Sequence, residues 1–565
     1  MSGTRGRGAT RPAGVADGPA HELETDVLVL GGGPAGTWAA VSAAEQGVRV
    51  VLADKGWCGT SGATASGGNN LWAVPPGAAR EDALRAREAI AGGLTDVGWM
   101  DRVLDQTWRR LDDLGTWGYP FPREADGTEH RTSLQGPEYM RRMRRRVHRS
   151  GVTILDHHPA LELLADADGA VVGAAGLARQ QGLAPWRVRA RAVVLATGGC
   201  AFLSGGFGTN VDTGDGQLMA AEAGAELSGM EFSTAYALSA AWGVHTKGLM
   251  LKFASYYDAD GTRLEPPPGV HGRAFAARLL TEGVEVHARL DQAPPHLRAA
   301  MREAQPNYFV PLEKAGVDPF EDRYPLRMVY EGTVRGTGGL RVVDEGCATT
   351  VPGLHVAGDA ATRELVTGSI SGGGSHNGAW AISSGTFAGR GAAATARARR
   401  GPVAPGEPLG RVGLRPGGRV DPEAADAVVA AVQEEVLPPA LTARRDGVRL
   451  AVTGRRLETV WTQAGDALGG EGRDALRARR AAALTANARW VTAAALARPE
   501  TRGMHRRTDR PDVDPGWGHR LLVGGLDRVW TRPDPVLPRL VDGTPVAVPA
   551  PQAAAPTAYE QRRAS

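Results

Sequence analysis

Short apolar runs alternate with helical patterns through the first 400 residues of the chain. Asp26 to Leu30 has the pattern of a short buried strand, Thr37 to Gln46 is Ala-rich and helical, and Arg49 to Ala53 is a second strand. Strand patterns return at Arg191 to Gly199 and at Thr350 to Ala361. This alternation of strands and helices predicts an α/β fold.

The pattern changes after this region. Residues 401–420 are dense in Gly and Pro without periodicity, which predicts a linker. Ala, Leu, Arg and Glu at helical spacing predict a helical domain over 421–505, and short strands around turns return over 506–548. The polar, Gly/Ala/Pro-rich ends, residues 1–22 and 549–565, are expected to be disordered tails.

Composition narrows the function classes. The chain has 565 residues, enough for several domains, and a formal net charge of +3. Its basic residues are scattered, so a nucleic-acid surface is not indicated. The densest basic run, Arg141 to Arg149, carries Met143 and Val147 at helical spacing, which predicts a solvated helix face over an apolar stripe.

The three cysteines, Cys58, Cys200 and Cys347, are widely separated and form no CxxC motif. We therefore expect no disulfide framework, no metal site and no iron–sulfur cluster ligated by this chain alone. No apolar segment follows the N-terminal arginines, and no stretch of about 18 uncharged apolar residues occurs. The sequence predicts a cytoplasmic protein without a transmembrane segment.

A dinucleotide-binding motif lies near the N-terminus. Gly31, Gly33 and Gly36 form GxGxxG between the first strand and the first helix. In this motif the first glycine allows a tight turn, the second admits a pyrophosphate, and the third lets the helix pack on the strand. Amides at the helix N-terminus then bind the phosphates. The second strand ends at Asp54, where a carboxylate accepts from a ribose hydroxyl.

Two further strands favour FAD over a nicotinamide cofactor. The strand "RAVVLATGG" ends in a Thr-Gly-Gly turn, and "TVPGLHVAGDAA" ends in Gly358-Asp359. Both patterns are typical of flavoproteins with two dinucleotide domains, in which the Gly-Asp pair meets the ribityl chain and the pyrophosphate. The sequence therefore predicts FAD as the cofactor.

Together these motifs resemble the flavoprotein family of fumarate reductase, succinate dehydrogenase, L-aspartate oxidase and the adenylylsulfate reductase alpha subunit. The resemblance also rests on "SGATASGG" (Ser61 to Gly68), "TNVDTGDGQLMAAEAGAEL" (Thr209 to Leu227) and "TGGLRVVDEG" (Thr337 to Gly346). Near the C-terminus, "AALARPETRGMHRRTDRPDVDPGWGHRL" (Ala494 to Leu521) is similar to the signature that ends the family's helical domain.

The resemblance implies a Rossmann-like FAD-binding domain split by an α+β capping domain and followed by the helical domain. The FAD-binding domain would comprise residues 23–229 and 339–400, and the capping domain residues 230–338. It also implies a site at the interface of these two domains. The implied cofactor-binding residues are Gly31, Gly33, Pro34, Ala35, Gly36, Asp54, Lys55, Ser61, Gly62, Ala63, Gly67, Gly68, Ala196, Thr197, Gly198, Asp215, Gly358, Asp359 and Ser375.

The chain departs from the family pattern at several functional positions. Ser61 occupies the position of the histidine that tethers FAD covalently in some members, so noncovalent FAD is expected. Val334 occupies the histidine position of the dicarboxylate motif, with Arg335 next to it, and Tyr236 occupies another family histidine position. A substrate arginine is missing from the region "SISGGGSHNG". We therefore expect neither a standard fumarate reductase or succinate dehydrogenase nor an L-aspartate oxidase.

Two short motifs, "TSGATASGG" and "ISSGTFAGR", are most similar to those of adenylylsulfate reductase alpha subunits. The histidine before the second motif in those enzymes aligns with Trp380 and not with His376, so its role does not transfer. The resemblance implies a possible separate, ferredoxin-like iron–sulfur partner, because this chain has no cluster cysteines of its own.

Three residues are candidates for catalysis, each with a structural alternative. His376 either donates to the flavin or an anionic substrate, or lies at a helix start beside Ser375 and Asn377 as caps of a helix beginning near Ala379. Arg335 either clamps an anionic substrate or is an exposed loop residue. Tyr236 either protonates a carbanion-like centre or packs in the seam below the cap.

Two residues of one cap loop, His245 and Lys247, are candidates for binding an anionic substrate, against the alternative of a solvated loop. The leading hypothesis is hydride transfer between flavin N5 and a small, polar, anionic substrate at the interface of FAD and cap. The alternatives are an O₂-using flavin oxidase or monooxygenase of secondary metabolism, and an electron-transfer flavoprotein subunit that works with an iron–sulfur protein.

Overall fold

The computed structural model describes residues 21–123, 126–245, 249–371, 373–541 and 543. Its main sheet has the strand order β17-β6-β7-β8-β1-β2-β5, and β16 pairs with β8 beside this path. The central strands β1, β2, β5, β8 and β16 run parallel, whereas β6, β7 and β17 are antiparallel additions. The strands are β1 (His21–Leu30), β2 (Val50–Ala53), β5 (Thr153–Leu155), β6 (Ala160–Ala165), β7 (Val171–Ala178), β8 (Ala184–Leu195), β16 (Leu354–Val356) and β17 (Glu407–Pro408).

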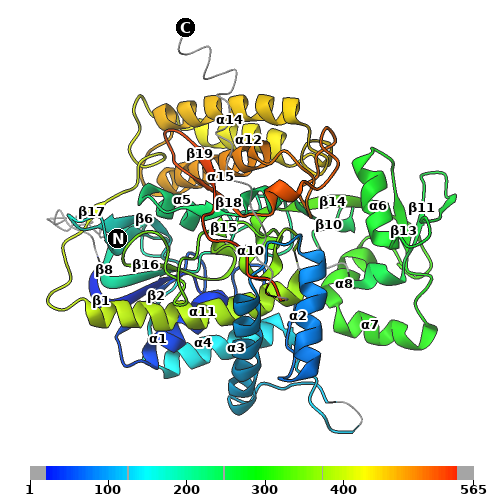
Figure 1. The fold of residues 1–565 in the computed structure, drawn as a ribbon, viewed down its shortest axis with the longest axis horizontal. Helices are drawn as coiled ribbons and strands as arrows, with labels where there is room; N and C mark the ends of the chain where they lie inside the picture. Colours follow the sequence, from blue (N-terminus) through cyan, green and yellow to red (C-terminus); the bar gives the residue numbers. More distant parts are fainter. Residues whose placement is uncertain (1–20, 124–125, 246–248, 372, 542, 544–565) are drawn as a thin grey trace, which may run out of the picture.

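Two helices with close backbone contact cover the part of the sheet that carries the glycine motif. α1 (Pro34–Ala44) follows β1, and α11 (Gly373–Ala398) lies along it (Figure 1). A Cβ on Gly385 would lie 2.3 Å from the carbonyl oxygen of Ala35, and one on Gly389 would lie 2.2 Å from that of Ala39. Two glycines four residues apart face the same side of a helix, and here they let α11 approach α1 closely.

The segment predicted to form the cap, residues 230–338 and called the cap below, contains a five-stranded sheet with the order β10-β14-β13-β11-β12 and an apolar core of its own. It forms the green lobe at the right of Figure 1. Its elements are η1 (Met230–Phe232), β10 (Ala235–Ala240), η2 (Leu249–Phe253), β11 (Ser255–Tyr257), β12 (Arg263–Leu264), α6 (Gly272–Thr281), β13 (His287–Arg289), η3 (Pro295–Leu297), α7 (Arg298–Ala304), α8 (Pro306–Lys314), β14 (Tyr324–Glu331) and α9 (Gly332–Arg335).

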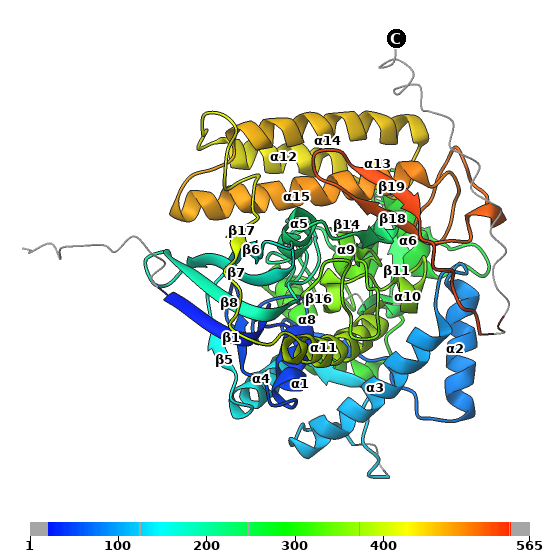
Figure 2. The same cartoon turned by 60° about the vertical axis from the view of Figure 1, so that its left-hand side comes forward.

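The C-terminal helices α12, α14 and α15 lie together above the main sheet (Figure 2). After them the chain returns to the start of the cap, where β18 pairs with β9. Strand β18 pairs with β9 and β19, and β9 pairs in turn with β15. This small sheet ties the last described part of the chain to the start and end of the cap. The elements are α12 (Ala424–Val436), α13 (Pro439–Thr442), α14 (Gly447–Ala467), α15 (Gly472–Ala497), η5 (Pro515–Trp517), β9 (Leu227–Ser228), β15 (Gly339–Leu340), β18 (Leu521–Gly524) and β19 (Trp530–Pro533).

The remaining elements include a second small sheet. In it, β3 pairs antiparallel with β4, which follows more than 60 residues later in the chain. These elements are β3 (Gly68–Asn70), α2 (Ala78–Ile90), α3 (Val97–Thr116), β4 (Ser133–Gln135), α4 (Gly136–Arg149), α5 (Asp215–Glu222), η4 (Gly358–Ala360) and α10 (Glu364–Thr367).

The predicted α/β fold class with a C-terminal helical region is confirmed. Helix α4 buries Met143 and Val147 as its apolar spacing predicts. Among the described residues, no helix is both long enough and apolar enough to span a bilayer.

Two local predictions are wrong. Residues 21 and 22 belong to β1 and not to a tail, because their backbone pairs with Trp186 and Arg187 of β8. Helix α11 begins at Gly373 and not near Ala379, so Ser375 and Asn377 lie inside the helix and do not cap it.

Candidate functional site

A cavity of about 500 Å³ opens at the carboxyl ends of β1 and β2, between the main sheet and the cap. Parallel sheets place ligand sites at this edge. The predicted cofactor residues that line it are Gly31, Gly33, Pro34, Ala35, Asp54, Lys55, Ser61, Gly62, Ala63, Gly68, Ala196, Thr197, Gly198, Asp215, Gly358 and Asp359. Gly36, Gly67 and Ser375 are not among its lining residues.

The glycine motif provides a cradle for phosphates. Gly31 has a φ of +113°, and a Cβ there would lie 2.2 Å from the carbonyl oxygen of Ala196. A Cβ on Gly36 would lie 1.8 Å from the carbonyl oxygen of Gly31, so this glycine serves packing and not ligand contact. A Cβ on Gly33 would meet no atom within 4 Å, although Gly33 lines the cavity. The cradle thus has room for a ligand at Gly33.

The N-terminus of α1 fits an anion. Gly33 is the N-cap residue and offers no side chain to the first amides of the helix. Such amides need an acceptor, and together with the helix dipole they favour a phosphate group. Pro34 at the first helical position lacks an amide and has a φ suited to the helix.

Asp54 holds the turn between β2 and the following loop. Its carboxylate accepts hydrogen bonds from the amides of Gly32 at 2.5 Å and Gly56 at 2.6 Å, and from the hydroxyl of Ser61 at 3.0 Å. Together the three donors fix the position of the carboxylate. Asp54 is therefore an acceptor group at the predicted ribose position, and Ser61 is engaged in holding it.

Lys55 and Asp215 form an ion pair across the cavity. The ammonium of Lys55 lies 2.5 Å from the carboxylate of Asp215 and donates to the hydroxyl of Thr213 at 3.0 Å. Asp215 is the first residue of α5, where a carboxylate is favoured by the helix dipole. The pair joins the loop after β2 to the start of α5.

A buried arginine that no sequence motif indicated fixes the Gly-Asp turn. Arg363 is fully buried, pairs with Asp359, and donates to the carbonyl oxygens of Thr333 and Val334 at 3.1 Å each. Burial raises the pKa of Asp359 and lowers that of Arg363, while the ion pair opposes both shifts. Arg363 thereby fastens the turn at Asp359 to α9, which carries Arg335.

The end of the cavity near the cap carries cationic and amide side chains. Arg335 lines it from α9, with its guanidinium 3.9 Å from Glu331. The cap adds Arg273 from α6 and Gln305 from the segment before α8. Neither of these two cap residues was predicted from the sequence, because scattered polar residues give no local signal. This end suits an anionic, hydrogen-bonding ligand.

His376 does not line the cavity. Its ring stacks on Trp72, with centroids 4.6 Å apart, and its Nδ1 lies 3.2 Å from the Ser375 hydroxyl. The next two residues of α11, Asn377 and Gly378, line the cavity instead, and the Asn377 amide donates to the carbonyl oxygen of Val334 at 3.3 Å. The helix therefore presents Asn377 where His376 was expected.

The other predicted substrate groups also lie away from the cavity lining. The Tyr236 hydroxyl donates to the carbonyl oxygen of Leu437 at 3.1 Å in the seam with the C-terminal helices, and burial raises its pKa. His245 is buried with its ring centroid 5.1 Å from that of Phe207 and 5.6 Å from that of Tyr308. Lys247 lies outside the described residues.

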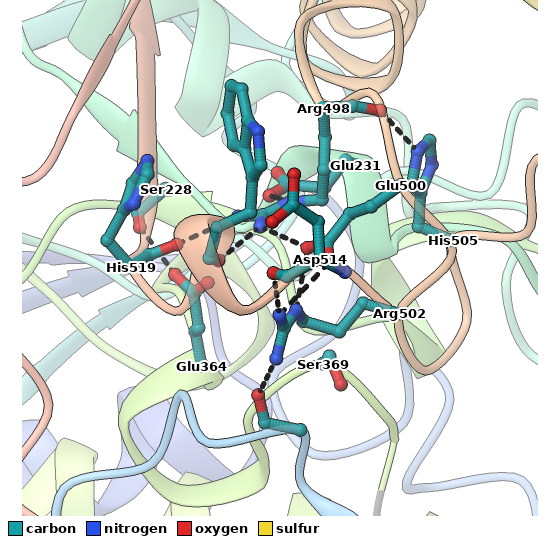
Figure 3. Close-up of polar contacts among 12 residues, drawn as sticks. Ser228, Glu231, Glu364, Ser369, Arg498, Glu500, Arg502, His505, Asp514 and His519 are labelled. Atoms are coloured by element: carbon teal, nitrogen blue, oxygen red, sulfur yellow. Dashed lines mark hydrogen bonds and ion pairs between the residues drawn. The ribbon is translucent and has the colours of Figure 1, made fainter. Parts of the chain in front are cut away.

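A buried ionic cluster ties the C-terminal segment to the base of the cap (Figure 3). The Arg498 guanidinium lies 2.8 Å from Glu231 and 2.9 Å from Glu500, and all three side chains are fully buried. Arg502 extends the cluster from Glu500 to the carbonyl oxygen of Gly92. The segment similar to the family signature thus joins the end of α15 to η1 at the start of the cap and to the loop after α2, and we refer to this cluster as the clamp.

The chain is similar to known flavoproteins along most of its length. The profile of the family described as FAD binding domain matches residues 26–375. The chain is 27% identical to L-aspartate oxidase of Streptomyces coelicolor, covering 97% of this chain and 98% of that protein. It is 25% identical to one chain of the CoM/CoB fumarate reductase of Methanothermobacter marburgensis, covering 88% of this chain and 97% of that one.

Solved structures show the same fold. A variant of the E. coli quinol fumarate reductase has a TM-score of 0.75 at 20% identity, covering 91% of this chain and 97% of that one. Adenylylsulfate reductase from Archaeoglobus fulgidus has a TM-score of 0.73 at 18% identity, covering 92% and 97%. At these identities the likeness concerns the fold.

Proposed function

This chain belongs to the FAD binding domain family and is an FAD-dependent oxidoreductase, and we propose that it acts on a small, polar anion held between the FAD-binding region and the cap. The observation that carries the proposal is that Arg335 of α9, Arg273 of α6 and Gln305 all line the cavity. Guanidinium groups recognise an anion by charge and by hydrogen bonds, and an amide side chain adds a further donor.

When bound, FAD supplies hydride transfer at flavin N5. Arg335 binds and orients the anionic group of the substrate, because α9 is fixed to the Gly-Asp turn through Arg363. Helix α11 adds the amide side chain of Asn377, from its second turn, to the same cavity.

We propose that the chain is neither a standard fumarate reductase or succinate dehydrogenase nor an L-aspartate oxidase. The support is that Val334, an apolar and buried residue of the cavity, occupies the histidine position of the dicarboxylate motif. Tyr236, at the second histidine position, bonds to the C-terminal helices. Purified enzyme given succinate, fumarate or L-aspartate with a redox dye tests this, and efficient turnover of any of them contradicts it.

Replacing Arg335 with Gln is expected to lower turnover of the anionic substrate about 10- to 100-fold while FAD remains bound, because a charged hydrogen bond to the substrate is lost. The rate at which the flavin absorbance bleaches under anaerobic conditions is compared between wild type and variant. A screen of small carboxylates, sulfonates and phosphates supplies the substrates.

His376→Ala is the matched comparison within the same region. Because His376 stacks on Trp72 outside the cavity lining, we expect turnover to change less than about threefold, within what a peripheral contact contributes. A large loss in His376→Ala together with an unaffected Arg335→Gln would reverse the proposed roles.

We propose that FAD is bound noncovalently. Ser61 takes the position of the tethering histidine, and its hydroxyl donates to Asp54. Acid precipitation of the holoenzyme is expected to release all of the flavin into the supernatant. Flavin fluorescence that stays with the protein band in a denaturing gel would show a covalent bond through another residue.

A further inference from the structure

Asp212 is a buried carboxyl group that lines the cavity and that the proposed reaction does not use. It lies in the turn before α5 and is 6% exposed. Its Oδ2 is enclosed and has no hydrogen-bond partner, and neither of its oxygens accepts a hydrogen bond from another described residue. Since Asp212 lines the cavity and Oδ1 is not among the enclosed atoms, Oδ1 is the oxygen that a bound ligand could contact.

The surroundings of Asp212 are acidic. The carboxyl group lies against the turn at Gly198, where a Cβ would be 2.4 Å from Oδ1. The charged groups that act on it are Asp359 of η4, Lys55 and Asp54 after β2, and Asp215 of α5. Asp212 in turn acts on the buried thiol of Cys200.

The one cation in this set is already paired. Lys55 bonds to Thr213 and Asp215, so it does not neutralise Asp212 by direct contact. Burial, with Asp359 and the other carboxylates, raises the pKa of Asp212 well above its usual value. An ionised and unpaired carboxylate here would be costly, whereas a carboxylic acid has a proton to donate.

A metal ion does not explain the acidic residues. Across the described ranges, no group of three or more His, Cys, Asp or Glu side chains is arranged to hold one. Asp54 and Asp212 differ in their hydrogen bonding: the Asp54 carboxylate accepts three hydrogen bonds, and the Asp212 carboxyl group accepts none.

We propose that Asp212 is a cofactor contact that acts as a neutral carboxylic acid and donates a hydrogen bond to an acceptor atom of bound FAD. Buried carboxyl groups kept neutral serve as donors in this way. Since FAD prefers the protonated form, binding takes up a proton wherever Asp212 is ionised in the apoprotein. By linkage, FAD affinity is constant at low pH and falls as the pH rises through the pKa of Asp212 in the apoprotein.

The test is FAD titration of the apoprotein between pH 5.5 and 9.5, with flavin fluorescence as the readout. Wild type is expected to lose affinity at the upper end, at most about tenfold per pH unit. Asp212→Asn keeps a neutral donor, so we expect a low-pH Kd within about threefold of wild type and no loss at high pH. Asp212→Ala is expected to bind about tenfold more weakly at low pH, the cost of one hydrogen bond.

Asp54→Asn is the matched control. It removes an ionised acceptor, so FAD should bind more weakly at every pH while the loss at high pH remains. A wild-type FAD affinity that stays constant or improves as the pH rises would overturn the proposal. A loss of affinity at high pH in Asp212→Asn equal to that of wild type would also overturn it, because the loss would then come from another group of the cavity such as His158.

A second measurement does not depend on the variants. Calorimetric titration of wild-type apoprotein with FAD in two buffers of different ionisation enthalpy gives the number of protons exchanged. Proton uptake that grows toward high pH is expected. Release of protons, or no exchange over the whole range, would contradict the proposal. Neither result depends on the identity of the substrate, so the proposed function is tested separately.

Discussion

Replacing Gly33 with Ala is expected to lower FAD affinity by up to about 100-fold while the protein remains folded. The added methyl group would meet no protein atom within 4 Å and would point into the cavity lining at the N-terminus of α1. The pyrophosphate of FAD must approach this backbone closely. Displacing it from the helix amides costs about 3 kcal/mol, the upper range of overpacking, which corresponds to about 100-fold.

Two other glycine variants serve as controls, one expected to be neutral and one expected to unfold the motif. Gly465→Ala lies in helix α14 with open space around the new Cβ, so FAD affinity and stability should stay at wild-type levels or improve slightly. Gly36→Ala places a Cβ 1.8 Å from the carbonyl oxygen of Gly31, so it should unfold the motif itself. Equilibrium titration with FAD and thermal unfolding separate the three. Wild-type affinity in Gly33→Ala would mean that FAD does not approach this turn.

Replacing Arg498 with Met is expected to lower the free energy of unfolding by about 3–5 kcal/mol. The substitution leaves the buried carboxylate of Glu231 without its ion-pair partner, whereas Glu500 keeps Arg502. Glu231 and Glu500 are fully buried and lie 2.8 Å and 2.9 Å from the guanidinium (Figure 3). Burial already raises the pKa of Glu231 even with Arg498 present. Urea-induced unfolding of the FAD-loaded protein measures the loss.

Arg411→Met is the control for removing one charge. Arg411 lies 3.6 Å from Asp527, and both side chains are largely exposed to solvent. Water screens such a pair, so little change in the unfolding midpoint is expected. If Arg411→Met and Arg498→Met lowered the free energy of unfolding equally, the buried cluster would not be the clamp.

The predictions for Gly33 and Arg498 differ in how far apart in the sequence the interacting residues lie. The glycine motif is local, since the strand, turn and helix that form the cradle are consecutive in sequence. Its residues therefore appear in the structure with the geometry that the pattern predicts, including the tight turn at Gly31. The clamp is not local, because Arg498 and Glu231 are 267 positions apart. The sequence indicated that the C-terminal segment matters, but not its acidic partner.

The catalytic candidates show where sequence reasoning stops. Successive residues of a helix point about 100° apart, so a shift of one position decides which side chain enters a cavity. Helix α11 begins at Gly373, earlier than expected, and its rotation presents Asn377 while His376 stacks on Trp72. Arg273 comes to the cavity from a separate sheet and helix layer of the cap, for which the sequence carries no spacing rule.

The sequence by itself determined the α/β class, the FAD-binding motif and the family resemblance, because each depends on consecutive residues whose backbone conformation and hydrogen bonds are set locally. Only the tertiary structure decided which charges meet. It placed Asp212 without a partner among three other carboxyl groups, paired Lys55 with Asp215, and gave Arg335 the support of Arg363. Burial and pairing of charges depend on segments far apart in the chain, and packing alone brings those segments together.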